Sequence, residues 1–223
     1  MFDAKIRPLI DPPLNRLGRA AAARGVRADH LTWGGFALGM AGAAAAALGW
    51  FWAALALVLL SRLADGLDGA VARATRPTDY GGFLDITLDF IFYAAVPLAF
   101  ALHDPAANAL AAATLLFTYF ANGASFLAYA VIAAKRGEET RAQGRKSIYY
   151  LAGLAEGFET ILFCALVCLV PAWFAPLAYG YAALVALSAA GRIWSAGALR
   201  GPAEADAPAL RDPDEDQASS ITS

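Results

Sequence analysis

Six apolar stretches dominate the chain, and they constrain its fold more than any other feature. Each is about 20 residues long, which is the length that a helix needs to cross the ~30 Å hydrocarbon layer of a membrane. They run over residues 31–49, 50–73, 82–102, 107–134, 147–170 and 174–194. The chain of 223 residues is 59% hydrophobic and only 16% charged, too little polar surface for a soluble domain of this length. We therefore predict an all-α integral membrane protein with six transmembrane helices.

The distribution of basic residues supports this count and orients the spans. The connections after the first, third and fifth spans, "GWFW", "HDPAAN" and "VPAWFAP", contain no Lys or Arg. All 17 basic residues fall on the other side of the six-span arrangement. Cytoplasmic segments are enriched in Lys and Arg, so both termini are predicted to be cytoplasmic.

The segments outside the spans differ in composition. Residues 1–30 mix apolar residues with spaced arginines, and Pro12 and Pro13 suit a helix start, so we predict an amphipathic helix on the cytoplasmic membrane surface. Residues 31–199 would form the transmembrane catalytic domain. Residues 200–223 are rich in Pro, acidic and small polar residues and are predicted to be a disordered acidic tail.

Four aspartates lie within this apolar context. Asp65 and Asp68 are three residues apart in the second predicted span, and Asp85 and Asp89 are four apart in the third. Either spacing places a pair on one helix face. A charged side chain at the centre of the lipid core costs about 2.5–3.5 kcal/mol, so four of them need a functional reason. Because consecutive antiparallel helices are usually neighbours, we expect the two pairs to face each other in the cytoplasmic half.

These carboxylates predict a metal site. Four of them in a region of low dielectric constant would repel one another unless cations neutralised them. Oxygen ligands with no His or Cys nearby select hard cations such as Mg²⁺, Mn²⁺ or Ca²⁺. Two divalent cations would balance the four charges, and two-metal sites are suited to displacement at phosphorus.

Neighbouring residues fit the use of a phosphorylated substrate. Gly66, Gly69 and Ala70 would leave bare helix surface where a bulky group can approach the backbone. Arg73 can neutralise a diphosphate through its forked guanidinium. Gly81 opens the third span, where free backbone amides favour an anion.

The residues together resemble a known family motif. "DGLDGAVAR", followed by "ATRPTDY" and "GGFLDITLD", is similar to the pattern D-x2-D-G-x2-A-R, about eight residues, then G-x3-D-x3-D of the CDP-alcohol phosphotransferases. Only seven residues separate Arg73 from Gly81, one fewer than is usual in the family. The missing residue falls in a predicted cytoplasmic loop and leaves the helical positions of the carboxylates intact.

The resemblance implies an enzyme of phospholipid biosynthesis in the bacterial inner membrane, with its active site facing the cytoplasm. Such enzymes transfer a phosphatidyl or other substituted phosphate group from a CDP-linked donor, usually CDP-diacylglycerol, to an alcohol and release CMP. It also implies a homodimer among membrane lipids, with no nucleic acid partner.

Residue roles follow from the same resemblance. Asp65, Asp68, Asp85 and Asp89 would hold two divalent cations, Mg²⁺ or Mn²⁺, and Asp89 would also act as the general base toward the acceptor hydroxyl. A carboxylate within reach of that hydroxyl suits this role. The donor and its nucleotide would be bound by the small residues and the arginine of the motif, namely Gly66, Gly69, Ala72, Arg73 and Gly81.

The acceptor stays open. Two groups of residues are candidates: basic residues in the fourth connection, which would bind an acceptor phosphate or serve as ordinary cytoplasmic charge near lipid headgroups, and acids deep in the fifth span, which would hold the acceptor or pair with Arg192. They are Lys135, Arg136, Arg145, Lys146, Glu156 and Glu159. Asn122 and Ser125 in the fourth span are candidates for interhelical hydrogen bonds.

Two other functions remain as alternatives. An intramembrane prenyltransferase also uses Asp-rich helices, Mg²⁺ and a diphosphate, but it typically has more spans and two separate Asp-rich motifs. A divalent-cation transporter should carry polar groups through both halves of the membrane, whereas the four aspartates lie in one half and Arg73 beside them would repel a cation.

Overall fold

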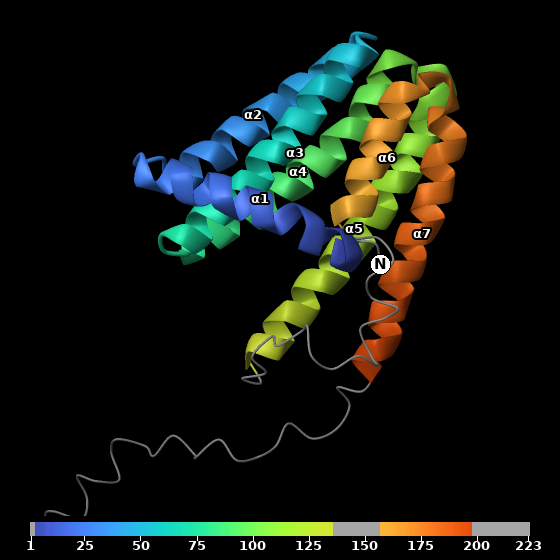
Figure 1. Cartoon of the computed structure of the whole chain (residues 1–223). Coiled ribbons are helices and arrows are strands. Elements are labelled where there is room, and N and C mark those ends of the chain that lie inside the picture. The colour runs from blue at the N-terminus through green and yellow to red at the C-terminus, as the bar shows by residue number, and fades with distance from the viewer. Residues whose placement is uncertain (1–2, 136–156, 198–223) are drawn as a thin grey trace, which may run out of the picture.

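The structure, a computed structural model, describes residues 3–135 and 157–197, which are entirely helical in their regular secondary structure (Figure 1). The helices run in chain order as follows: α1 (Asp3–Ala23), α2 (Ala28–Ala47), α3 (Phe51–Ala74), α4 (Asp79–His103), α5 (Pro105–Lys135), α6 (Gly157–Leu169), the short 3-10 helix η1 (Pro171–Trp173) and α7 (Phe174–Ser195). The predicted all-α class is confirmed.

Three helical segments of the described chain are long and apolar enough to cross a membrane. They are Asp79–His103, Pro105–Ile132 and Pro171–Ser195, and they coincide with the predicted third, fourth and sixth spans. Helices α2 and α3 lie where the first two spans were predicted, and α6 is a shorter apolar helix at the end of the predicted fifth span. The count of six spans stays a prediction.

The first helix is longer than the sequence indicated. Pro12 and Pro13 were predicted to start it, but α1 begins at Asp3 and contains both prolines in its interior. This boundary prediction was wrong. Each proline lacks the N–H that would bond to the carbonyl four residues earlier. Those carbonyls belong to Pro8 and Leu9, which are exposed, so other partners such as water can satisfy them.

Helix α2 joins the two helices that carry the aspartates. Both α3 and α4 pack along α2, whereas α3 and α4 make almost no backbone contact with each other. The expectation that these consecutive helices would pack as direct neighbours was therefore wrong. Glycines allow α2 to come close: a Cβ at Gly35 would lie 3.1 Å from the Cβ of Ala64 on α3, and one at Gly39 would lie 2.7 Å from the ring of Phe92 on α4. The space between α3 and α4 is left for side chains.

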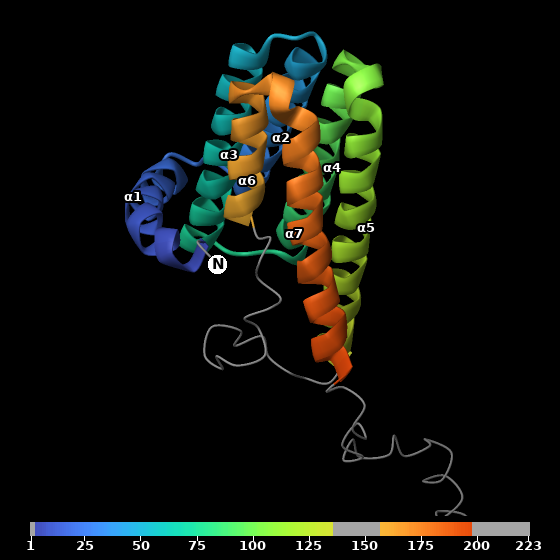
Figure 2. The same ribbon diagram turned by 90° about the vertical axis from the view of Figure 1, so that its right-hand side faces the viewer.

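One end of the bundle is closed by aromatic packing. Phe100 near the end of α4 stacks on Phe174 at the start of α7, with ring centroids 4.5 Å apart, and on Phe51 at the start of α3, at 5.6 Å. Phe163 stacks on Tyr181 at 4.8 Å. The turns joining α2 to α3, α4 to α5 and α6 to α7 lie at this upper end in Figures 1 and 2. The aspartates lie in the opposite halves of α3 and α4.

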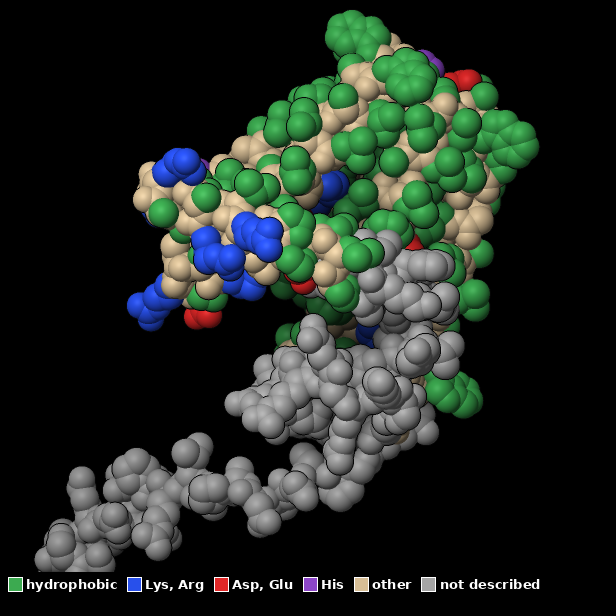
Figure 3. Space-filling model, in the orientation of Figure 1, with side chains coloured by type: hydrophobic (Ala, Val, Ile, Leu, Met, Phe, Trp, Pro, Cys, Tyr) green, Lys and Arg blue, Asp and Glu red, His purple; other side chains and the backbone are tan. Residues whose placement is uncertain are grey.

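The outer surface matches a lipid environment. Hydrophobic side chains cover much of the bundle face in Figure 3, while Lys and Arg side chains gather over α1. Large aromatic side chains such as Trp52, Phe120 and Trp194 are at least three-quarters exposed. A soluble monomer rarely leaves so extensive an apolar surface uncovered. Helix α1 lies across α3 and packs mainly against it.

Candidate active site

Three of the four aspartates meet between α3 and α4. Asp65, Asp68 and Asp85 each offer one oxygen, and these atoms all lie within 4.8 Å of one another. Oxygens that bind one hard cation at about 2.0–2.6 Å lie no more than about 5 Å apart, so the spacing fits a single ion. The predicted convergence is confirmed for these three residues.

The burial of Asp68 also fits a cation. Its side chain is buried, and its Oδ2 atom has no hydrogen-bond partner among the described residues. An unpaired buried carboxylate oxygen costs free energy, and a bound cation would compensate for this cost. The donor set consists of carboxylate oxygens alone, which suits Mg²⁺ or Mn²⁺.

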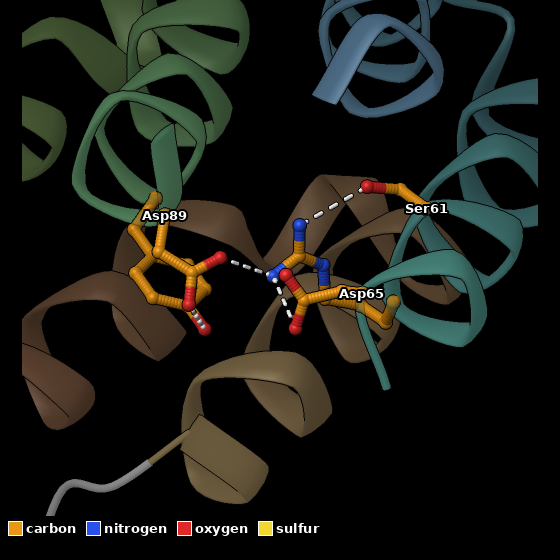
Figure 4. A network of polar contacts seen from close by, with 5 residues as sticks. Ser61, Asp65 and Asp89 are labelled. Carbon is orange, nitrogen blue, oxygen red and sulfur yellow. Dashed lines mark hydrogen bonds and ion pairs between the residues drawn. The ribbon is translucent and has the colours of Figure 1, made fainter. Parts of the chain in front are cut away.

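Asp89 faces the same space but has different partners. Its Oδ1 accepts a hydrogen bond from Arg62 Nη1 at 2.6 Å, and its Oδ2 accepts one from the hydroxyl of Tyr93 at 3.2 Å. Figure 4 shows Asp89 and Asp65 pointing toward each other from the two helices, with the Arg62 contacts between them. The structure therefore places Asp89 beside the three-aspartate group and outside it.

Arg62 is one of the site residues that the sequence analysis missed, because it was counted with the basic residues of the cytoplasmic side. Its side chain is 7% exposed, and its Nη1 lies 3.6 Å from Asp65 Oδ2 as well as beside Asp89. The available signal was spacing. Arg62 precedes Asp65 by three residues, so it shares that helix face and lies one turn deeper, where a charge is functional by default.

Helix α1 covers part of the surface that was predicted to be bare. A Cβ at Gly66 would lie 3.1 Å from Leu14 of α1, and Ala70 is fully buried against Gly18. The prediction of open helix surface was wrong at these two positions, because α1 packs there. At Gly69 an added Cβ would meet only the side chain of Arg73, at 3.2 Å, so this part of α3 stays accessible.

Arg73 is exposed and is oriented by α1. Its Nη2 and Nε donate to Asn15 Oδ1 at 3.1 and 3.4 Å. Ala72, the residue before it, is half-buried. The amide of Gly81 is not free as predicted, because α4 begins at Asp79 and this amide donates to the N-cap hydroxyl of Thr78 at 3.0 Å.

The acceptor candidates are only partly visible. Lys135 ends α5 and is exposed, and Glu159 is half-buried in the first turn of α6. Four others lie outside the described residues: Arg136, Arg145, Lys146 and Glu156.

The predicted interhelical hydrogen bonds of α5 are confirmed. Arg192 of α7 donates through Nη1 to Asn122 Oδ1 at 2.9 Å and to Ser125 Oγ at 2.8 Å. The same nitrogen also donates to the Asn122 carbonyl at 3.0 Å. These bonds join α5 to α7 and place a basic side chain inside the bundle.

A family model described as CDP-alcohol phosphatidyltransferase matches residues 26–194 of this chain. The chain belongs to this family. It is accordingly an enzyme of the CDP-alcohol phosphatidyltransferase type, a class that acts on a CDP-linked substrate and an alcohol acceptor and uses divalent metals. The aspartate cluster lies within the matched range.

Named relatives agree with this membership. The chain is 49% identical over 195 residues to the inner membrane protein YnjF of Escherichia coli, covering 87% of this chain and 95% of that protein. It is 43% identical over 89 residues to an archaetidylinositol phosphate synthase of Methanothermobacter thermautotrophicus, covering 40% and 42% of the two chains. The enzyme of the same name from Pyrococcus horikoshii is 35% identical over 100 residues, covering 44% and 53%.

Proposed function

We propose that this enzyme transfers a phosphatidyl group from CDP-diacylglycerol to the hydroxyl of a polar alcohol, with release of CMP, in phospholipid biosynthesis. The observation that carries the proposal is the convergence of Asp65, Asp68 and Asp85 within 4.8 Å, in a chain that belongs to this family. Family membership argues against the two alternatives, an intramembrane prenyltransferase and a cation transporter.

One set of residues would bind the CDP-linked donor. Asp65, Asp68 and Asp85 would hold a divalent cation, which when bound would polarise the donor phosphate and neutralise the leaving group. Arg73 would bind the donor diphosphate with its guanidinium, which is already oriented by Asn15. The accessible surface at Gly69 would receive the cytidine, with Ala72 beside it and Gly81 at the start of α4.

Asp89 would act as the general base. In the proposed step it takes the proton of the acceptor hydroxyl while that oxygen forms a bond to the phosphorus that carries the diacylglycerol group. The bond from this phosphorus to the bridging oxygen of the diphosphate breaks, and CMP leaves with the electron pair. A second divalent cation, Mg²⁺ or Mn²⁺, is proposed from the charge of the four carboxylates and from the diphosphate that the donor brings.

A phosphorylated polyol is the proposed acceptor class. Two relatives are named archaetidylinositol phosphate synthase, which points to an inositol phosphate group in their product. In this chain the cytoplasmic connection after α5 is basic, from Lys135 through Arg136, Arg145 and Lys146. Such residues suit an acceptor phosphate. Glu156 and Glu159 would then bind the polyol hydroxyls, because a carboxylate oxygen accepts a hydrogen bond from a hydroxyl group.

The proposed setting is the inner membrane of a bacterium, with the site open to the cytoplasm and two copies of the chain in a dimer. The relative YnjF is named an inner membrane protein. The basic residues of α1 and of the α3–α4 connection lie at the same end of the bundle as the aspartates, as expected for the cytoplasmic side.

The test is an assay of CMP release by purified protein. CDP-diacylglycerol and Mn²⁺ or Mg²⁺ would be combined with a panel of alcohols: inositol phosphate, glycerol phosphate, free inositol and serine. We expect CMP to appear only with a suitable acceptor, to be abolished by chelation of the metal, and to be fastest with a phosphorylated polyol. Asp68→Asn is the matched negative control. Absence of CMP with every acceptor would contradict the proposed reaction.

A further inference from the structure

Arg62 lies at the centre of the site, although the motif does not include it. Its side chain is 7% exposed, and Nη1 lies 2.6 Å from Asp89 and 3.6 Å from Asp65. Its Nε atom is buried and has no hydrogen-bond partner in the part of the chain that the structure describes. Burying a guanidinium costs several kcal/mol unless its partners compensate, so a purely packing role would be expensive.

Two groups besides the carboxylates hold the guanidinium in place. Its Nη2 donates to Ser61 Oγ at 3.1 Å, and its central carbon lies 4.3 Å from the ring centroid of Phe92. Phe92 is fully buried, and Gly39 of α2 approaches its ring so closely that an added Cβ would lie 2.7 Å away. Ser61 is also fully buried. The Arg62 head group is thus held against α3 and α4 by groups that have no free space to move into.

The position of this head group conflicts with a cation shared by Asp65 and Asp89. Such an ion would have to occupy the space between the two carboxylates, and Arg62 already contacts both of them. A guanidinium and a divalent ion at this spacing repel strongly in a medium of low dielectric constant. One oxygen from each of Asp65, Asp68 and Asp85 still lies within 4.8 Å of the other two, a group that does not include Asp89.

We propose that Arg62 is a positioning residue: it holds Asp89 outside the aspartate cluster, so that the donor-free site binds one divalent cation. The charges agree with this occupancy. Arg62 and one divalent cation leave one net negative charge on the four carboxylates, and a second divalent cation would turn this into one net positive charge, which the diphosphate of a bound donor would offset. In the donor-free enzyme Arg62 takes the place of the second ion, and Asp89 is aimed by its hydrogen bonds to Arg62 and Tyr93.

The experiment measures Mn²⁺ bound per chain without any CDP-linked lipid, in nanodiscs of phosphatidylcholine so that no anionic lipid competes. The double variant Asp65→Asn/Asp68→Asn gives the background. Above this background we expect one Mn²⁺ for the unchanged protein and one for Asp89→Asn. Arg62→Met should bind two, because the cation is lost and Asp89 is freed to act as a ligand. Arg62→Lys should bind one, since the positive charge is kept.

The outcomes separate this inference from the proposed function on which it rests. Two Mn²⁺ in the unchanged protein, or loss of the ion in Asp89→Asn, would overturn the role of Arg62 and leave the metal-dependent reaction standing. Binding no greater than the background would overturn both. These measurements decide the question even where Arg62→Met fails to fold. Where it folds, a count of one would equally overturn the proposal, and Arg62→Met/Asp89→Asn should return the count from two to one.

Discussion

Asp89 differs from the other three aspartates of the motif in what its oxygens contact. Both of its oxygens accept hydrogen bonds from protein groups, at 2.6 Å from Arg62 and 3.2 Å from Tyr93, whereas a buried oxygen of Asp68 has no hydrogen-bond partner among the described residues. A general base must be correctly aimed, and two fixed donors would provide this. A metal ligand needs free oxygen atoms instead. The proposed function therefore gives the same residue type two roles on α3 and α4.

The change Asp89→Asn tests the base directly. We expect CMP release to fall by about 10²–10⁴-fold, the usual contribution of a positioned base, because the amide cannot take the hydroxyl proton. The amide oxygen can still accept from Arg62, so the fold should persist. CMP release and Mn²⁺ binding would be measured on the same preparation. Asp79→Asn, an exposed acid in the first turn of the same helix, is the control and should retain activity. Full activity in Asp89→Asn would exclude this residue as the base.

Tyr93 offers a milder test of the same geometry. Tyr93→Phe removes one hydrogen bond to Asp89 and keeps the ring, so we expect kcat to fall by up to about 10-fold, the equivalent of a single hydrogen bond. The matched control is Tyr119→Phe. The Tyr119 hydroxyl is buried and without a hydrogen-bond partner among the described residues, so its removal should leave kcat unchanged and raise stability slightly. Equal effects of the two changes would show that the Tyr93 hydroxyl does not orient Asp89.

At the scale of helices, α1 packs beside the candidate site, whereas the sequence predicted only a membrane-surface segment. It packs on the face of α3 that carries Gly66, Ala70 and Arg73, and Asn15 holds the Arg73 guanidinium. The amphipathic pattern of residues 1–30 predicted a surface helix but gave no partner for it. A sequence shows that a face is apolar or small, and it does not show which other face will cover it.

The contact between α1 and α3 predicts that two glycines differ in how much their replacement by alanine changes stability. A Cβ at Gly18 would lie 2.6 Å from the Cβ of Ala70 and 2.7 Å from its carbonyl carbon, while one at Gly34 of α2 has no atom within 4 Å. Gly18→Ala should cost about 1–3 kcal/mol through overpacking. Gly34→Ala should be neutral or stabilising by up to about 1 kcal/mol, because alanine favours a helix. Thermal unfolding in detergent would compare them.

Catalysis gives a second readout for the same pair. If α1 orients Arg73, Gly18→Ala should also raise the KM for the CDP-linked donor, whereas Gly34→Ala should not. An unchanged melting temperature in Gly18→Ala would mean that α1 does not pack as closely on α3 in solution.

Among the helices, the apolar pattern predicted where each helix lies along the chain better than it predicted which helices pack together. The third, fourth and sixth predicted spans correspond to α4, α5 and α7 with boundaries shifted by a few residues, because a run of apolar residues determines where a helix lies. The lateral order was not predictable in this way. The packing of α3 and α4 on α2 depends on Gly35 and Gly39, whose role appears only when the facing side chains are known. The spacing of Arg62 and Asp65 was visible in the sequence, but the contact of Arg62 with Asp89, 27 residues away, was not predictable.

For the molecule as a whole, the two ends of the bundle differ in the residues that they contain. The end formed by the α2–α3, α4–α5 and α6–α7 turns is packed with stacked aromatic rings and contains no aspartate of the site. The other end holds the acids, α1 and the exposed Arg73. This division agrees with the charge pattern from which the sequence analysis inferred cytoplasmic termini. If the proposed function holds, we expect a water-soluble acceptor to reach Asp89 from the basic end.

That polarity can be tested by labelling single cysteines in spheroplasts with a maleimide that does not cross membranes. The native Cys164 and Cys168 are buried and would be replaced by alanine. Ala106→Cys lies in the exposed first turn of α5 and should react in intact spheroplasts, whereas Pro77→Cys in the α3–α4 connection should react only after lysis. The reverse pattern would place the aspartates on the outer side, where CDP-linked lipids made from cytoplasmic CTP could not serve directly as donors. Because the positions lie at opposite ends of α4, labelling of both in intact spheroplasts would show that this helix does not cross the membrane.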